Sequence, residues 1–293
     1  MRKRVLFSVL LLTPSLFAQN ANNDGLSFAS LQHEFAGTTL NYRQAVVEGK
    51  SDEGKALVIY LHGGSSCGTD NITQMQEPGI DSIGHYLVDH QQSAVFLVPQ
   101  CPDRNRGWGG MVKDIKALLD FAAHNEGVDP DRIYIFGGSM GGTGTWKMLS
   151  SYHNYFAAAM PCAANPKGMN AENVATTPVY NVMGGADKIM DGEVRAIAED
   201  FINQLNALGD ETKYEVVAGW SHETTCIQSY TTPRLDWVFA HARQTTDFVS
   251  SVTTQSSSTD RWYSLQGIEV LFPKQPGIYV QYSCEMVLNL RSQ

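Results

Sequence analysis

The sequence predicts an α/β fold built on a doubly wound, mostly parallel sheet. Short runs that are apolar throughout alternate along the chain with stretches in which apolar residues recur at helical spacing. Continuous apolar runs are typical of strands that are covered by helices on both faces. A Gly-x-Ser-x-Gly pentapeptide, residues 137–141, stands between one such run and a helical pattern. Alternating strands and helices in this order predict a single sheet between two helical layers.

The first half of the domain begins with a polar stretch, which we expect to be an irregular lead-in over residues 19–35. The next segment, 38–47, has strand character and fits the antiparallel edge that opens many α/β sheets. Two buried strands and two helices then follow. Their expected bounds are 56–61 for the first strand, 80–88 for the first helix, 94–98 for the second strand and 111–124 for the second helix.

The second half continues the alternation from the strand at 132–136, which runs into the pentapeptide and a helix. Only residues 161–177 separate the next two strands, so we expect no lid domain there and a site open to bulky substrates. The other expected elements are strands at 156–160, 178–183 and 213–217, and helices at 191–208 and 232–242.

Composition describes an ordinary globular protein, with 43% hydrophobic and 17% charged residues. The formal net charge of −9 makes nucleic acid an improbable partner. Residues 1–18 combine a basic start, an apolar core and a small residue at the end, which predicts a signal peptide rather than a membrane anchor. We therefore expect an exported protein, located in the periplasm, on the cell surface or outside the cell.

Five cysteines in an exported chain permit disulfides but leave one thiol over. Cys67 and Cys101 both follow predicted strands at the same end of the sheet and are the first pair to test. Free, buried thiols are an equal alternative. The sequence has no Cys-x-x-Cys motif and no histidine cluster, so we expect neither a metal nor another cofactor.

Ser139, at the centre of the pentapeptide, is the candidate nucleophile. A serine hydroxyl is a weak nucleophile and requires a base, which in turn requires an acid to orient it. In this architecture the chain order is serine, acid, histidine, with the last two on loops after strands. His222 follows a late strand and Asp187 follows the strand before it. Asp191 is the rival acid, but it fits better as the cap of the following helix.

The glycine-rich loop that follows the first buried strand is the candidate oxyanion hole. Gly64 in that loop and Met140, directly after the nucleophile, would each direct a backbone N–H at the developing charge. For His62, which begins the loop, we expect a structural role. Trp108 is a candidate for lining the acyl or sugar pocket, although a lone tryptophan is more often packing. Gln100 and Trp220 are further substrate-binding candidates.

Residues 36–242 resemble the α/β-hydrolase superfamily. They resemble in particular exported esterases related to feruloyl and acetylxylan esterases and to polyhydroxybutyrate depolymerases, a group also labelled predicted peptidases. The likeness rests on residues 61–64, 98–102, 129–146, 184–187 and 221–222. One departure is that the loop at 64–68 lacks a charged residue often found there, which leaves substrate preference open.

Composition shifts to Ser and Thr over residues 245–260, which predicts a linker between the catalytic domain (19–244) and a small β segment (261–293). The tail resembles C-terminal sorting modules of type IX secretion, which would make the secretion machinery a partner. A β-hairpin packed on the catalytic domain is the alternative.

The resemblance implies a serine esterase that removes feruloyl or acetyl groups from plant polysaccharides. Two alternatives are a serine peptidase of the prolyl oligopeptidase type and a non-catalytic carbohydrate-binding protein on a hydrolase scaffold. The peptidase is the weaker reading because no propeller precedes the catalytic region.

Overall fold

A computed structural model describes residues 26–50 and 54–243, together with four short strands between residues 261 and 291. The chain forms two compact units, Met1–Thr245 and Thr246–Gln293. The signal peptide expected over residues 1–18 and the linker expected over 245–260 lie outside the described residues.

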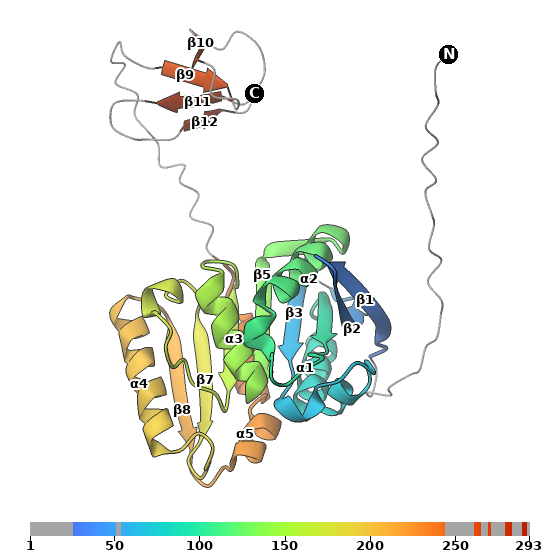
Figure 1. The fold of residues 1–293 in the computed structure, drawn as a ribbon, viewed down its shortest axis with the longest axis vertical. Helices are drawn as coiled ribbons and strands as arrows, with labels where there is room; N and C mark the ends of the chain where they lie inside the picture. The colour runs from blue at the N-terminus through green and yellow to red at the C-terminus, as the bar shows by residue number, and fades with distance from the viewer. Residues whose placement is uncertain are drawn as a thin grey trace. The chain divides into compact units, whose positions relative to one another are not determined.

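The first unit is built on an eight-stranded sheet with the order β1-β2-β4-β3-β5-β6-β7-β8 (Figure 1). Strands β1 and β2 are antiparallel, and β2 also runs antiparallel to β4. From β4 to β8 every neighbouring pair is parallel. The strands are β1 (Ala29–Phe35), β2 (Thr38–Val47), β3 (Lys55–Leu61), β4 (Ala94–Pro99), β5 (Val128–Gly138), β6 (Ala158–Cys162), β7 (Val179–Gly184) and β8 (Thr212–Val217).

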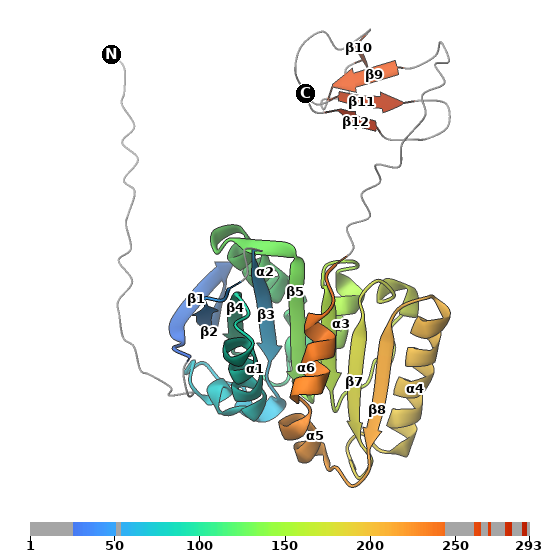
Figure 2. The same cartoon turned by 180° about the vertical axis from the view of Figure 1, so that it is seen from behind.

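Helices cover both faces of this sheet. α2, α3 and α4 lie on one face, and α1 and α6 lie on the other (Figures 1 and 2). The helices are α1 (Pro78–Asp89), α2 (Val112–Asn125), α3 (Met140–Ser151), α4 (Gly192–Ala207), α5 (His222–Gln228) and α6 (Thr232–Phe239). Single 3₁₀ turns are η1 (Gly64–Ser66), η2 (Thr73–Gln76), η3 (Trp108–Gly110) and η4 (Ala171–Asn173).

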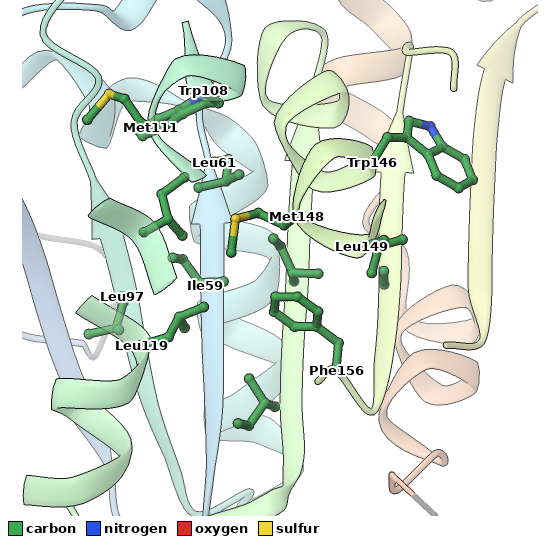
Figure 3. Packing of buried hydrophobic residues seen from close by; sticks show 14 of the residues in the cluster. Ile59, Leu61, Leu97, Trp108, Met111, Leu119, Trp146, Met148, Leu149 and Phe156 are labelled. Carbon is green, nitrogen blue, oxygen red and sulfur yellow. The ribbon is translucent and has the colours of Figure 1, made fainter. Parts of the chain in front are cut away.

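Strand β3 shows why its apolar run is continuous. Successive side chains of a strand point to opposite faces of the sheet. Ile59 and Leu61 pack in the core under α2, α3 and α4, with Met148 among their neighbours (Figure 3). Val58 and Tyr60 pack in the core under α1 and α6. Both faces are therefore buried, as the continuous pattern predicts.

The doubly wound, mostly parallel sheet is confirmed, and most element bounds differ from expectation by three residues or fewer. Three expectations were wrong. Residues 29–35, expected to be irregular, form β1, and this strand rather than β2 is the sheet edge. β5 begins at Val128, four residues before the expected start of this strand at 132, because Lys55 pairs with Val128 across an irregularity in the register. α5 was not anticipated.

The second unit contains a four-stranded antiparallel sheet with the order β10-β9-β11-β12. Its strands are β9 (Arg261–Ser264), β10 (Glu269–Val270), β11 (Tyr279–Tyr282) and β12 (Asn289–Arg291). Among the described residues of the chain, no helix combines the length and apolar character needed to cross a bilayer.

Candidate active site

Ser139 lies in the sharp turn between β5 and α3. Its φ of +57° is in the left-handed region, which side chains rarely adopt, so the turn holds the serine under strain. The flanking glycines permit this turn. A β-carbon at Gly141 would lie 1.7 Å from the carbonyl oxygen of Leu61, and one at Gly137 would lie 2.5 Å from Gly141. The Ser139 amide donates to the carbonyl of Cys162 at 3.0 Å, which ties the turn to β6.

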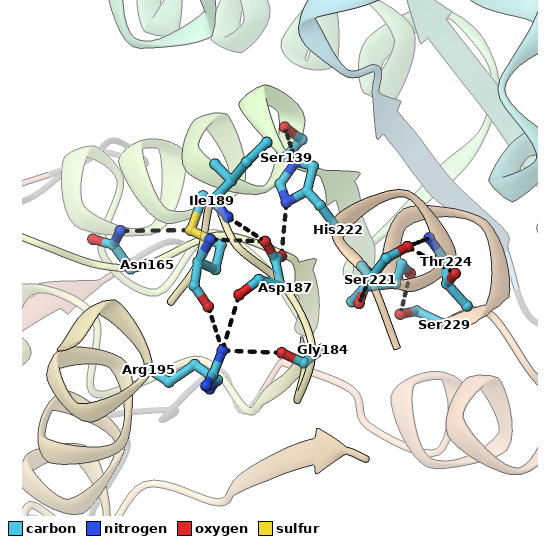
Figure 4. Close-up of polar contacts among 12 residues, drawn as sticks. Ser139, Asn165, Gly184, Asp187, Ile189, Arg195, Ser221, His222, Thr224 and Ser229 are labelled. Carbon is cyan, nitrogen blue, oxygen red and sulfur yellow. Dashed lines mark hydrogen bonds and ion pairs between the residues drawn. The ribbon is translucent and has the colours of Figure 1, made fainter. Parts of the chain in front are cut away.

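The structure brings the three candidate triad side chains together (Figure 4). Ser139 Oγ lies 2.8 Å from His222 Nε2, and His222 Nδ1 lies 2.7 Å from Asp187 Oδ2. The Asp187 side chain is fully buried and that of His222 is 18% exposed. A carboxylate that accepts from Nδ1–H leaves Nε2 as a proton acceptor, which is the tautomer that a general base requires.

Two sets of hydrogen bonds hold the loop that carries Asp187. Asp187 Oδ1 accepts the backbone N–H groups of Ile189 and Met190 at 2.7 and 2.8 Å, so the second carboxylate oxygen is also satisfied. Arg195 Nη1 donates to the carbonyls of Met190, Gly184 and Asp187 (Figure 4). These bonds fix the orientation of the acid before substrate arrives.

Asp191 lies outside this hydrogen-bonded chain. Its Oδ1 accepts the backbone N–H groups of Glu193 and Val194, both at 3.1 Å, and so caps the N-terminus of α4. The rival acid therefore has a structural role of its own, while His222 Nδ1 is bonded to Asp187.

Two backbone amides are available as an oxyanion hole. Among the described residues, neither the Gly64 nor the Met140 amide has an acceptor. Met140 is the first residue of α3, where the helix dipole also favours negative charge. The loop with Gly64 abuts the elbow, because a β-carbon at Gly63 would lie 3.8 Å from the carbonyl oxygen of Gly138. The arrangement leaves two unbonded N–H groups in segments that adjoin the turn of the nucleophile, as an oxyanion hole requires.

Glu77, at the start of α1, holds the oxyanion loop in place. Its Oε1 accepts the Gly63 amide at 3.0 Å and the Ser66 hydroxyl at 2.6 Å. Its Oε2 accepts weakly from the Tyr60 hydroxyl at 3.4 Å. These contacts leave the Gly64 amide between two anchored residues.

His62 is buried beneath the same loop. The backbone N–H of Cys101 lies 2.9 Å from Nε2, which must therefore be the acceptor. Nδ1 then carries the proton and donates to the Gly63 carbonyl at 2.7 Å. Burial lowers the pKa of His62 from its usual 6.5, which also favours the neutral ring. Both ring nitrogens are thus occupied by backbone groups, so the imidazole supports the loop.

The substrate-binding expectations for Trp108 and Gln100 do not fit the structure. Trp108 is 1% exposed and its indole N–H donates to the His62 carbonyl at 2.9 Å, so it packs under the oxyanion loop. Gln100 is also 1% exposed, and it accepts from the Asn71 amide while donating to Asp70. Neither side chain is left to line a pocket.

Trp220 is half-buried beside the core, with the Arg234 guanidinium 5.3 Å from the centre of its ring. Its carbonyl accepts the Ala186 amide at 2.9 Å, one residue before Asp187. Trp220 thus holds the acid loop through its backbone carbonyl.

Cys67 and Cys101, the pair favoured for a disulfide, are free thiols, as are Cys162 and Cys226. Cys284 lies outside the described residues. Burial raises the pKa of Cys67 above its usual value and that of Cys101 to about 12, so both thiols stay protonated at neutral pH. Within the described part of the chain, no cluster of three His, Cys, Asp or Glu side chains could hold a metal ion.

Sequence reasoning missed Glu77 and Arg195. Glu77 acts on a loop that ends 11 residues before it, and Arg195 acts on the backbone carbonyls of the loop directly before its helix. Neither contact belongs to a recognised local motif. The one available signal was for Arg195, which lies four residues into the helix that follows the acid loop, where a long side chain can reach back to loop carbonyls.

Several solved structures share this architecture. A thermostable esterase matches with a TM-score of 0.65 and 24% identity, over 74% of this chain and 63% of that one. A feruloyl esterase module from Clostridium thermocellum matches with a TM-score of 0.56 and 11% identity, over 75% of this chain and 92% of that one. An acylaminoacyl peptidase from Pyrococcus horikoshii matches with a TM-score of 0.54 and 14% identity, over 75% and 42%.

The chain has the α/β-hydrolase fold. Sequence comparison agrees over a shorter region. The prolyl oligopeptidase family matches residues 105–222, which is less than half of the chain but includes Ser139, Asp187 and His222. Poly(3-hydroxyalkanoate) depolymerase C from Paucimonas lemoignei is 32% identical over 120 residues, which is 38% of this chain and 28% of that protein. On this fold the chain thus has a Ser139–His222–Asp187 site of the serine-hydrolase type.

Proposed function

We propose that this α/β-hydrolase is an exported serine esterase that releases acyl groups, feruloyl or acetyl, from plant polysaccharides. The observation that carries the proposal is the unbroken chain from Ser139 Oγ through His222 to Asp187, at 2.8 and 2.7 Å. A scaffold that had lost catalysis would not need to keep these three side chains within hydrogen-bond distance of one another.

In the acylation step, Ser139 Oγ attacks the ester carbonyl while His222 Nε2 takes the hydroxyl proton. The carbonyl oxygen becomes an oxyanion, for which the amides of Gly64 and Met140 are the donors. Asp187 stabilises the imidazolium that forms. When the tetrahedral intermediate collapses, the bond to the alcohol breaks and His222 gives the proton to the departing alkoxide.

In the deacylation step, water takes the place of the alcohol. His222 removes a proton from that water, which attacks the acyl-serine carbonyl and forms a second oxyanion in the same hole. The Ser139–acyl bond then breaks, the proton returns to Oγ, and a carboxylic acid leaves. The chain therefore needs no cofactor for the reaction that we propose.

Two observations support a polymer-borne ester. The segment between β6 and β7 holds only the short turn η4 among its described residues, so no lid helix arises there. Such a site leaves the serine accessible to an ester on a long chain. Two of the matching proteins also support it by name: one is a poly(3-hydroxyalkanoate) depolymerase and the other is a feruloyl esterase module.

A serine peptidase is the second candidate, because the matching sequence family is that of prolyl oligopeptidases and an acylaminoacyl peptidase shares the fold. The same triad serves both reactions, since only the leaving group differs. Amide cleavage demands protonation of a poorer leaving group, so peptide substrates separate the two candidates.

The test compares p-nitrophenyl acetate, methyl ferulate, acetylated xylan, feruloylated arabinoxylan and a peptide p-nitroanilide, with Ser139→Ala as the blank. We expect turnover of the esters, both small and polymeric, and little of the anilide. p-Nitrophenyl palmitate, measured above and below its aggregation threshold, should be a poor substrate with no jump in rate. A preference for the anilide would favour the peptidase, and interfacial activation would favour a lipase.

The N-terminal signal-like segment motivates the proposed export to the periplasm, cell surface or medium. The likeness of the tail to type IX sorting modules motivates the secretion machinery as a partner. Deletion of residues 261–293, followed by cell fractionation, tests whether the tail directs secretion.

A further inference from the structure

The loop between β4 and α2 brings an arginine against the oxyanion loop. A β-carbon at Gly64 would lie 2.9 Å from Arg104 Nε and 3.3 Å from its Cζ, so the guanidinium rests on the open side of Gly64. The same loop also touches the other candidate oxyanion residue. A β-carbon at Gly107 would lie 3.6 Å from the carbonyl oxygen of Arg104 and 3.8 Å from Met140 Sδ.

The backbone around Arg104 is held in a defined shape. The amides of Gly107 and Asn105 donate to the carbonyl and the Oδ1 of Asp103, at 2.9 and 2.8 Å. Gly107 has a φ of +54°, which permits the tight return of the chain. Arg106 anchors the far side of the loop through Asp114 Oδ2 at 2.8 Å and the Gly110 carbonyl at 3.0 Å. The loop therefore presents Arg104 from a fixed base.

The two arginines of this loop differ in their partners. Arg106 is neutralised by the nearly buried carboxylate of Asp114. Arg104 is exposed, and among the described residues its side chain has no hydrogen bond or ion pair. The nearest acidic residue in sequence, Asp103, already accepts the Asn105 amide. A guanidinium without a partner, next to the oxyanion loop of a chain with net charge −9, is available for an anion from outside.

We infer that Arg104 binds a carboxylate that the substrate carries near its scissile ester. This inference rests on the proposed esterase function and adds a substrate class to it: esters of acidic sugars or of dicarboxylic acids. Arg104 can meet the carboxylate with two parallel N–H donors, a geometry that a lysine does not reproduce. The contact selects substrate and takes no part in the proton transfers.

The test measures kcat/KM on two pairs of esters at pH 7. For an acyl-side carboxylate, mono-p-nitrophenyl adipate is compared with its methyl ester. For an alcohol-side carboxylate, 4-carboxyphenyl acetate is compared with its methyl ester. Each pair differs in one negative charge, and the neutral members report whether the chain is an esterase at all.

The wild-type enzyme should prefer the anionic member of at least one pair, and Arg104→Gln should lower the anionic-to-neutral ratio by about 5-fold to 20-fold. The loss should lie mainly in KM, because the carboxylate keeps its charge throughout the reaction. Arg104→Lys should keep part of the preference. Lys213→Gln makes the same charge change near the start of the edge strand β8, at the end of the parallel strands away from the loops of the site, and should leave the ratio unchanged. Added salt should weaken the preference.

Several outcomes overturn the inference. A wild-type ratio that Arg104→Gln does not change would exclude a contact with the carboxylate. An equal loss on both members of a pair would show that Arg104 only supports the loop. An equal fall in Lys213→Gln would assign the effect to net charge. Inactivity of the wild-type chain on all four esters would instead overturn the proposed esterase function, and this inference with it.

Discussion

The carboxylate of Glu77 lies 3.0 Å from the backbone nitrogen of Gly63. Through this bond Glu77, the residue directly before α1, positions the loop that carries Gly64. An oxyanion donor is effective only when it is already aimed at the developing charge, so the position of this loop should matter for turnover.

Removal of the Glu77 side chain should therefore lower kcat more than it raises KM. We expect Glu77→Ala to lose about 10-fold to 100-fold in kcat, less than the loss on removing a donor outright, because Gly64 stays present but poorly held. Glu77→Gln keeps an acceptor oxygen and should retain more activity. Steady-state kinetics on a neutral ester and a melting curve for each variant measure this. Equal kcat in the two variants would contradict a positioning role.

Ser139→Ala should fold normally and lose nearly all esterase activity. The loss should reach about 10⁴-fold or more in kcat, because the members of a triad act as a unit. Alanine keeps a β-carbon at the strained φ of +57°, so the melting temperature should change little. If most activity remained, Ser139 could not be the nucleophile.

Asp187→Asn and Asp191→Asn form a matched pair. Asparagine at 187 presents an amide to His222 and should favour the wrong tautomer, at a cost of about 10⁴-fold in kcat. Asparagine at 191 can still cap α4, so kcat and stability should stay close to wild type. The two kcat values decide the assignment, and the reverse ranking would move the acid role to Asp191.

His62 should make the protein less stable in mild acid. Burial lowers its pKa in the folded state below the usual 6.5, so the unfolded chain binds more protons in that range. Stability from the neutral ring is fully present above pH 6.5 and is lost as the pH falls through the folded pKa. Urea unfolding between pH 5 and 8 and ¹⁵N NMR of the ring measure this. A His62 resonance that titrates at or above 6.5 would contradict it.

Truncation after Gln244 should leave a soluble, active catalytic unit, because the second unit begins at Thr246. If the tail is a sorting module, the truncated chain should also fail to reach its usual destination. Cell fractionation and an ester assay on the same samples test both points. An insoluble or inactive product would show that the tail belongs to the catalytic fold.

The sequence by itself determined the layered parallel sheet, the turn at Ser139 and the order of serine, acid and histidine. These features depend on short-range rules: apolar periodicity sets strands and helices, and glycines on both sides of a residue permit a sharp turn. The order of serine, acid and histidine along the chain then placed Asp187 and His222 after the carboxyl ends of two neighbouring parallel strands. The sequence could not give the distances between the three side chains.

Only the tertiary structure decided which side chains near the site face substrate. Trp108 and Gln100 have residue types common in binding pockets, yet contacts with His62 and Asn71, 46 and 29 residues away along the chain, bury them. Glu77 and Arg195 became part of the site through backbone groups of neighbouring loops, and of the two arginines in the loop after β4 only Arg106 finds an ionic partner, Asp114, among the described residues. Such pairings depend on how loops pack against each other, and local sequence pattern does not encode that.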